Sequence, residues 1–152
     1  MTTRVWIRIA LAYLALQSVQ IGLWALAAPR SFYDGFPGLG RGWIAVDGPF
    51  NEHLIRDVGA LQLSLMVVFI SAAMTLHAAL IRVACAAALV WGVPHFLYHL
   101  ANTGGLSTSD QFGLLGGLAL FAALPFAVLW WSQSLEVTGS ANGSKEVVEP
   151  VE

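Results

Sequence analysis

Four long apolar stretches constrain the fold of this 152-residue chain more than any other feature of its sequence. The hydrocarbon core of a bilayer is about 30 Å thick, so a helix of about 20 mostly apolar residues crosses it. We expect such helices at residues 5–28, 51–76, 78–101 and 111–131. Because 57% of the residues are apolar and only 11% are charged, little of the chain is left for a soluble domain. The sequence therefore predicts an all-α integral membrane four-helix bundle.

The charged and cysteine residues exclude several classes of function. The net charge of −2 comes from scattered groups with no run of Lys or Arg, so we expect no nucleic-acid partner. Cys85 is the only cysteine and lies in an apolar run, which excludes an intramolecular disulfide and a four-cysteine zinc site. We interpret Cys85 as a small packing residue.

The first span has features of a signal peptide, with Arg4 and Arg8 at its start and Pro29 as a stop. Its apolar run is longer than the core of a signal peptide, so we expect an uncleaved helix. Cationic side chains favour the cytoplasmic side of a membrane. The termini and the second loop hold four of them: Arg4, Arg8, Arg82 and Lys145. The first loop holds Arg30 and Arg41, so the bias favours an inner (plasma) membrane protein with both termini in the cytoplasm.

The connection at residues 29–50 is long for so small a protein and holds five glycines and several aromatic residues. The aromatic residues are Phe32, Tyr33, Phe36, Trp43 and Phe50. Such a segment either anchors in the headgroup layer or folds over the helix ends as a lid.

The fourth span ends on Trp130 and Trp131, an aromatic pair typical of a membrane interface. Gly113 and Gly117 within it form a GxxxG spacing, through which a second copy of the chain could pack. Residues 132–152 are polar and lack periodicity, so we expect a disordered tail there.

Polar residues gather at three span ends that an antiparallel bundle brings to one membrane face. These ends are the start of the second span, the end of the third and the start of the fourth. The residues are Glu52, His53, Arg56, Asp57, His95, Tyr98, His99, Asn102 and Asp110.

Two pairs among these residues have the spacing of metal ligands on a helix. His53 with Asp57, and His95 with His99, lie four residues apart and so share a helical face. Imidazole and carboxylate groups from neighbouring helices bind zinc, copper or iron in helical bundles. The sequence therefore predicts a metal site formed by these four residues, with Pro94 able to bend the helix before His95.

Other members of this polar group are candidates for chemistry. Glu52 is a candidate acid or base, Arg56 an anion partner and Tyr98 a hydrogen-bond donor. The structural alternative pairs Glu52 with Arg56 along the helix and leaves the histidines bonded to each other or to loop carbonyls. Asp57 lies within a span, where an ionised group requires a partner.

A second polar track follows one face of the first span. Its members, together with two residues of the second span, are Tyr13, Gln17, Gln20, Trp24, Gln62 and Ser64. Polar residues in membrane helices mostly form interhelical hydrogen bonds, and we favour that role here over a pocket for a lipid or quinone.

Residues 51–61 (NEHLIRDVGAL) and 94–99 (PHFLYH), with four spans over about residues 5–131, resemble the DoxX-like group of small bacterial membrane proteins. Members of that group have been linked to quinone-coupled sulfur oxidation and to membrane complexes that handle oxidative stress. The resemblance implies a four-helix membrane bundle and carries over no catalytic residue.

Two functions are therefore expected. The first is a polar site at the outer membrane face that binds a metal ion or a small ligand, and an enzyme acting on a lipid or quinone would use the same residues. The second is a non-enzymatic accessory subunit of a larger membrane complex, in which the polar residues hold the helix ends together.

Overall fold

The protein is all-α in a computed structural model that describes residues 2–146, with side chains described through residue 133. Within these residues the elements are α1 (Thr3–Ala27), α2 (Pro29–Gly35), α3 (Glu52–Thr75), α4 (Ala78–Ala101) and α5 (Thr108–Glu146). Helices α1, α3 and α4 are long and apolar enough to cross a membrane, and so is the Thr108–Gln133 part of α5. The predicted all-α membrane bundle is confirmed, and the chain is a multi-pass membrane protein.

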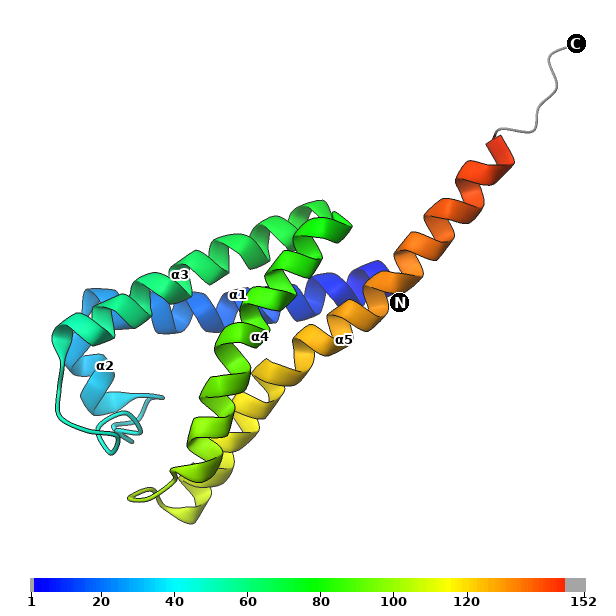
Figure 1. Cartoon of the computed structure of the whole chain (residues 1–152). Helices are drawn as coiled ribbons and strands as arrows, with labels where there is room; N and C mark the ends of the chain where they lie inside the picture. Colours follow the sequence, from blue (N-terminus) through cyan, green and yellow to red (C-terminus); the bar gives the residue numbers. More distant parts are fainter. Residues whose placement is uncertain (1, 147–152) are drawn as a thin grey trace, which may run out of the picture.

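The four long helices form two antiparallel pairs that diverge from one end (Figure 1). α1 packs mainly on α3 and α4 on α5, whereas contacts between the pairs are fewer. The pairs meet at the turn end, which holds the start of α1 and the α3–α4 turn at residues 76–77. They separate toward the loop end, which holds α2 and the connections 36–51 and 102–107.

An apolar core joins the two pairs near the turn end. Ile7 of α1, Phe69 of α3, Ile81 of α4 and Val128 of α5 are all fully buried in it. Ring contacts extend this core, since Phe69 meets Phe121 edge to face with ring centroids 6.5 Å apart. Burial of this apolar surface holds the pairs together at one end only.

Two glycines allow α1 and α3 to cross closely. A Cβ atom added at Gly59 would lie 3.0 Å from the backbone oxygen of Gly22 and 3.0 Å from the backbone nitrogen of Leu26. A Cβ atom at Gly22 would lie 2.6 Å from a methyl group of Leu63 and 3.0 Å from the backbone oxygen of Gly59. Small residues at such crossings let helix backbones approach within a membrane.

The helix ends follow from local sequence. Pro29 lacks the N–H group that would continue α1 and has the φ angle that suits a first helical position, so it stops α1 and begins α2. Asn51 caps α3, because its side chain accepts a hydrogen bond from the Leu54 backbone nitrogen at 3.1 Å. Leu76 takes the left-handed conformation after α3 and lets the chain reverse into α4.

Two stretches differ from the sequence prediction. The predicted loop at 29–50 contains the seven-residue helix α2, which is too short to give a periodic pattern of its own. The predicted disordered tail at 132–152 is helical through Glu146, and its last residues, 147–152, lie outside the described part. Proline is the strongest helix breaker, and none occurs between Pro125 and Pro150.

We predict that Gly59→Ala destabilises the protein. The added methyl group meets backbone atoms of α1 that a rotamer change cannot move, so the free energy of unfolding should fall by about 1–3 kcal/mol. Reversible unfolding in mixed detergent micelles measures this loss. Gly117→Ala is the matched control, because no atom lies within 4 Å of the added Cβ there. Equal stability of the two variants would contradict the close crossing.

Candidate functional site

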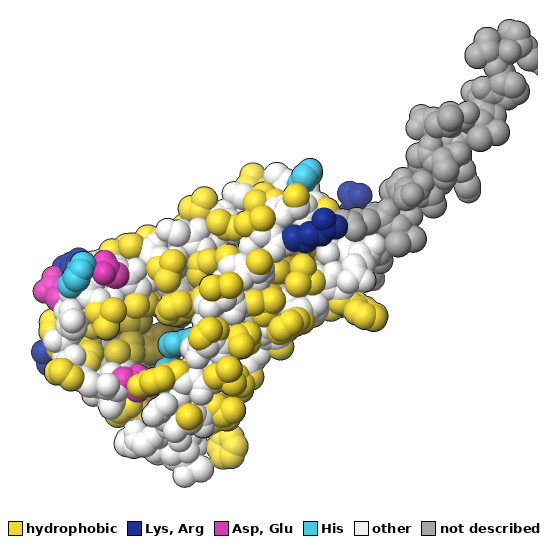
Figure 2. Space-filling view, in the orientation of Figure 1, with side chains coloured by type: hydrophobic (Ala, Val, Ile, Leu, Met, Phe, Trp, Pro, Cys, Tyr) yellow, Lys and Arg dark blue, Asp and Glu magenta, His cyan; other side chains and the backbone are white. Residues whose placement is uncertain are grey.

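The surface between the two helix pairs is hollowed at the loop end (Figure 2). Hydrophobic side chains line this recess, and histidine atoms reach the surface at its edge. The recess exists because α4 leaves the α1–α3 pair as it approaches its carboxyl end (Figure 1). Polar groups from α4 and from the 36–51 connection lie beside it.

The α4 side of the recess carries a ladder of rings. Trp91 stacks on His95 with ring centroids 4.9 Å apart and planes 21° apart. His95 in turn meets His99 edge to face at 4.8 Å, and Tyr98 meets His99 at 5.2 Å. His99 is buried, whereas Tyr98 is 51% exposed. The predicted shared face of His95 and His99 is therefore present, and Pro94 lies within an α4 that continues on both sides of it.

A loop carboxylate approaches this ladder. The Oδ2 atom of Asp47 lies 4.0 Å from Nε2 of His99, an ion-pair distance if the imidazole is protonated but longer than a hydrogen bond. The sequence does not single out Asp47, because helical spacing relates residues only within one helix. Its position depends on how the 36–51 connection folds, and no short-range pattern reports that.

The other predicted ligand pair lies elsewhere. His53 and Asp57 approach each other to 3.4 Å at the start of α3, with side chains 87% and 61% exposed. His53 is thus the neighbour of Asp57 at the start of α3, and both side chains lie at the surface rather than inside the bundle.

The predicted four-residue metal site is not assembled in this geometry. Among the described side chains, no three His, Cys, Asp or Glu groups lie together as metal ligands would. The start of α3 and the end of α4 do lie at the same end of the molecule, but they belong to different helix pairs, and these pairs have diverged there. Antiparallel connection places residues at one membrane face without bringing them into contact.

The three arginines of the loop end each have a carboxylate partner. These ion pairs are Arg30–Asp34 at 2.7 Å, Arg56–Glu52 at 2.8 Å and Arg41–Asp110. The hydrogen bond to Asp34 and the negative charge of that carboxylate raise the pKa of Arg30. Arg56 also donates to the backbone oxygen of Leu26 at the end of α1. Glu52 and Arg56, the candidate catalytic pair, therefore hold the α1 and α3 ends together and do not reach the α4 ring ladder through any hydrogen bond or ion pair among the described residues.

Residues 36–51 form a strap that joins the two pairs across the loop end. On the α1–α3 side, Phe36 and Phe50 pack in an apolar cluster with Phe32 and Ile55. The hydroxyl of Tyr33 donates to the backbone oxygen of Gly48 at 2.5 Å. These contacts pack the aromatic residues over the helix ends, which is one of the two roles expected for them beside anchoring in the headgroup layer.

The other side of the strap is tied to α5 through Asp110. Its carboxylate accepts hydrogen bonds from Trp43 Nε1 at 2.9 Å, from Ser107 Oγ at 2.6 Å and from Arg41. The Trp43 ring lies against Gly113, where an added Cβ would be 3.0 Å away. Gly113 therefore receives a ring of the same chain, and only Gly117 of the predicted GxxxG pair is open.

The residues of the predicted polar track have different environments in the structure. Gln20 is exposed, and Trp24 donates to Ser31 Oγ at 3.2 Å. Gln62 is 2% exposed and Ser18 fully buried, and in the described part of the chain neither the Gln62 Oε1 atom nor the Ser18 Oγ atom has a hydrogen-bond partner. Ser64 bonds to the Ala60 backbone oxygen of its own helix. The expected interhelical hydrogen bonds of Gln62 and Ser64 are therefore absent from the described residues.

Comparisons with protein-family models, with curated proteins and with solved structures give no match. The resemblance to DoxX-like proteins thus rests on the residues quoted for it, and the function has to be argued from the recess itself.

We predict that Asp110→Ala loosens the strap. The substitution removes an acceptor shared by Trp43 and Arg41, so the strap loses its side-chain hydrogen bonds to α5. Amide hydrogen exchange should therefore become faster across residues 36–51. Asp34→Ala is the control, because its ion pair with Arg30 is exposed and contributes little. Unchanged exchange in the Asp110 variant would show that the strap is held by its apolar contacts alone.

Proposed function

We propose that the protein binds the polar head of a membrane-soluble small molecule in the recess at the loop end. The observation that carries this proposal is the pair of α4 imidazoles at the edge of an apolar hollow. His99 is buried, yet neither it nor His95 makes a hydrogen bond within the described residues. No nitrogen of His95 or His99 is among the fully buried side-chain atoms of the described residues that lack a partner, so both imidazoles keep donors and acceptors that a ligand can reach.

The chemistry of the recess favours a flat head group that carries carbonyl or hydroxyl oxygens. A neutral imidazole offers one donor and one acceptor, which match the oxygens of a quinone or quinol. The ring faces of Trp91 and His95 suit an aromatic head, and the apolar wall suits the tail of a membrane-soluble molecule. The DoxX-like resemblance supports the same class of ligand, since members of that group have been linked to quinone-coupled chemistry.

Each polar residue near the recess then has a role. His95 and His99 bind the oxygens of the head group, and Tyr98 supplies a further hydroxyl donor beside His99. Asp47 places a carboxylate 4.0 Å from His99 at the edge of the recess. His53, Asp57, Glu52 and Arg56 lie at the start of α3 and take no part.

We infer that the loop end faces outward from an inner (plasma) membrane, with the amino terminus and the end of α5 in the cytoplasm. All carboxylates with described side chains belong to the loop end and its strap, and the turn end carries Arg4, Arg8 and Arg82 (Figure 2). The three arginines of the loop end are neutralised by ion pairs. Positive charge on the side of the turn end supports this orientation.

A titration with short-chain ubiquinone tests the proposal. Trp91 stacks on His95, so a quinone bound at that imidazole should quench tryptophan fluorescence. We predict that the double variant His95→Ala, His99→Ala remains helical and binds at least tenfold more weakly, because two hydrogen bonds of about 1 kcal/mol each are lost. The double variant His53→Ala, His77→Ala removes two histidines outside the recess and should bind like the natural protein.

Metal analysis of the same samples, purified without chelators, separates the two ligand classes expected from the sequence. Near-stoichiometric zinc, copper or iron that is lost only in the His95, His99 variant would identify a metal ion as the ligand of these imidazoles. Absence of both quenching and metal in the natural protein would reject the recess as a binding site.

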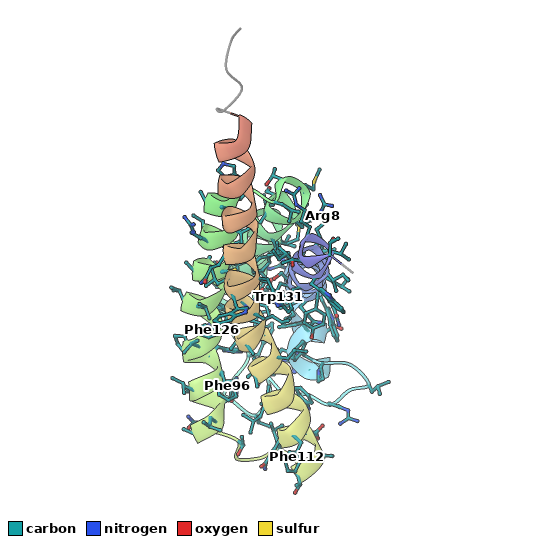
Figure 3. All side chains as sticks on the ribbon, turned by 90° about the vertical axis from the view of Figure 1, so that its right-hand side faces the viewer. Arg8, Phe96, Phe112, Phe126 and Trp131 are labelled. Atoms are coloured by element: carbon teal, nitrogen blue, oxygen red, sulfur yellow. The ribbon has the colours of Figure 1, made fainter. Side chains whose placement is uncertain are left out.

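An accessory subunit is the second candidate, and an open glycine surface on α5 favours it. Gly116 and Gly117 have no atom within 4 Å of an added Cβ, and the neighbouring Phe112 is 76% exposed and, like Phe126, lies on the outer side of the bundle (Figure 3). A surface of this kind lets a partner helix approach closely. It fits a helix of a larger membrane complex or a second copy of the chain.

We predict that Gly117→Leu separates these two functions. The side chain enters open space, so the variant should fold and bind quinone like the natural protein. If α5 packs on a partner, the leucine blocks the approach, and cross-linking in native membranes should lose the corresponding band. An identical cross-linking pattern in the natural protein and the variant would count against a partner at this surface.

A further inference from the structure

A second concave surface lies on the α1–α3 pair near the turn end, separate from the recess. It is a groove of about 670 Å³ between the two helices, with apolar walls. Ala12 and Leu16 of α1 lie on one side, and Ile70 and Met74 of α3 on the other. Leu16 and Met74 are 60% and 73% exposed, so the groove opens on the lipid-facing side of the pair.

One cation stands at the end of this groove. Arg8 lines the groove from α1, and its Nε atom donates a hydrogen bond to the backbone oxygen of Ala73 at 3.1 Å. This bond fixes the guanidinium beside the last turn of α3 (Figure 3) and leaves its terminal N–H groups for another acceptor. No carboxylate among the described side chains forms an ion pair with Arg8.

The length of the groove corresponds to one leaflet. Its α1 wall runs over the twelve residues from Arg8 to Val19, and the eleven rises of 1.5 Å between them give about 16 Å. Half the hydrocarbon core of a bilayer is about 15 Å. A groove of this length can therefore hold one acyl chain from the headgroup layer to the middle of the membrane, with Arg8 at its charged end.

We propose that this groove binds an anionic phospholipid, with one acyl chain between α1 and α3 and the phosphate on Arg8. A guanidinium pairs with phosphate through two parallel hydrogen bonds, and an arginine this close to a helix start extends its head to the interface. Arg4 lies one turn earlier on the same helix face and adds positive charge for the rest of the headgroup. The small side chain of Ala12 leaves room in the groove for the acyl chain.

Native mass spectrometry of the full chain with phosphatidylglycerol tests this proposal. We expect the natural protein to retain phosphatidylglycerol at least fivefold more than phosphatidylcholine. Arg8→Gln should abolish this preference, and Arg8→Lys should restore most of it. Arg30→Gln at the loop end is the control, and its retention should not change.

A second variant tests the groove itself and guards against a folding defect. Ala12→Phe places a ring in the groove from an exposed position, so helicity should persist while retention of both lipids falls. Thermal unfolding of each variant without added lipid verifies the fold. Equal retention of the two lipids by the natural protein, or full retention by both Arg8→Gln and Ala12→Phe, would overturn the proposal.

Discussion

The close crossing of α1 and α3 at Gly22 and Gly59 is the contact on which the rest of the molecule depends. Neither glycine has a side chain, so backbone atoms of α1 and α3 approach closely there and the two helices form one packed unit. α4 and α5 join this unit mainly through the apolar core near the turn end. With the pairs attached at one end, the other end is open for the recess, and the strap has two separate walls to connect.

The bilayer explains how much of this could be predicted from sequence. Spans are set by hydrocarbon thickness, and helix periodicity places His95 and His99 on one face, so both features follow from local pattern. The divergence of the pairs depends on which helix packs on which, and that comes from contacts between distant residues. The sequence pattern therefore groups His53 and Asp57 with His95 and His99, whereas the structure places them on another helix pair. Asp47 and α2 lie in a connection whose fold depends on tertiary contacts. Neither span length nor helix periodicity predicts the structure of such a segment.

Charge is distributed so that the two ends of the bundle have different chemistry. The loop end combines five described carboxylates with three arginines, and each of these arginines is in an ion pair. The turn end keeps arginines beside apolar surface, a combination that suits phosphate headgroups and hydrocarbon together. In our two proposals, one face of this short bundle binds a polar head with an aromatic ring and another binds an anionic lipid.

The strap also links the angle between the helix pairs to the position of Asp47. It is bonded to α5 through Asp110 and packed on the α1–α3 pair through Phe36 and Phe50, and between these attachments it carries the carboxylate that faces His99. Any change in the angle between the helix pairs must therefore displace Asp47 relative to that imidazole. By thermodynamic reciprocity, a ligand that binds one Asp47–His99 distance more tightly than another would also favour one angle between the helix pairs.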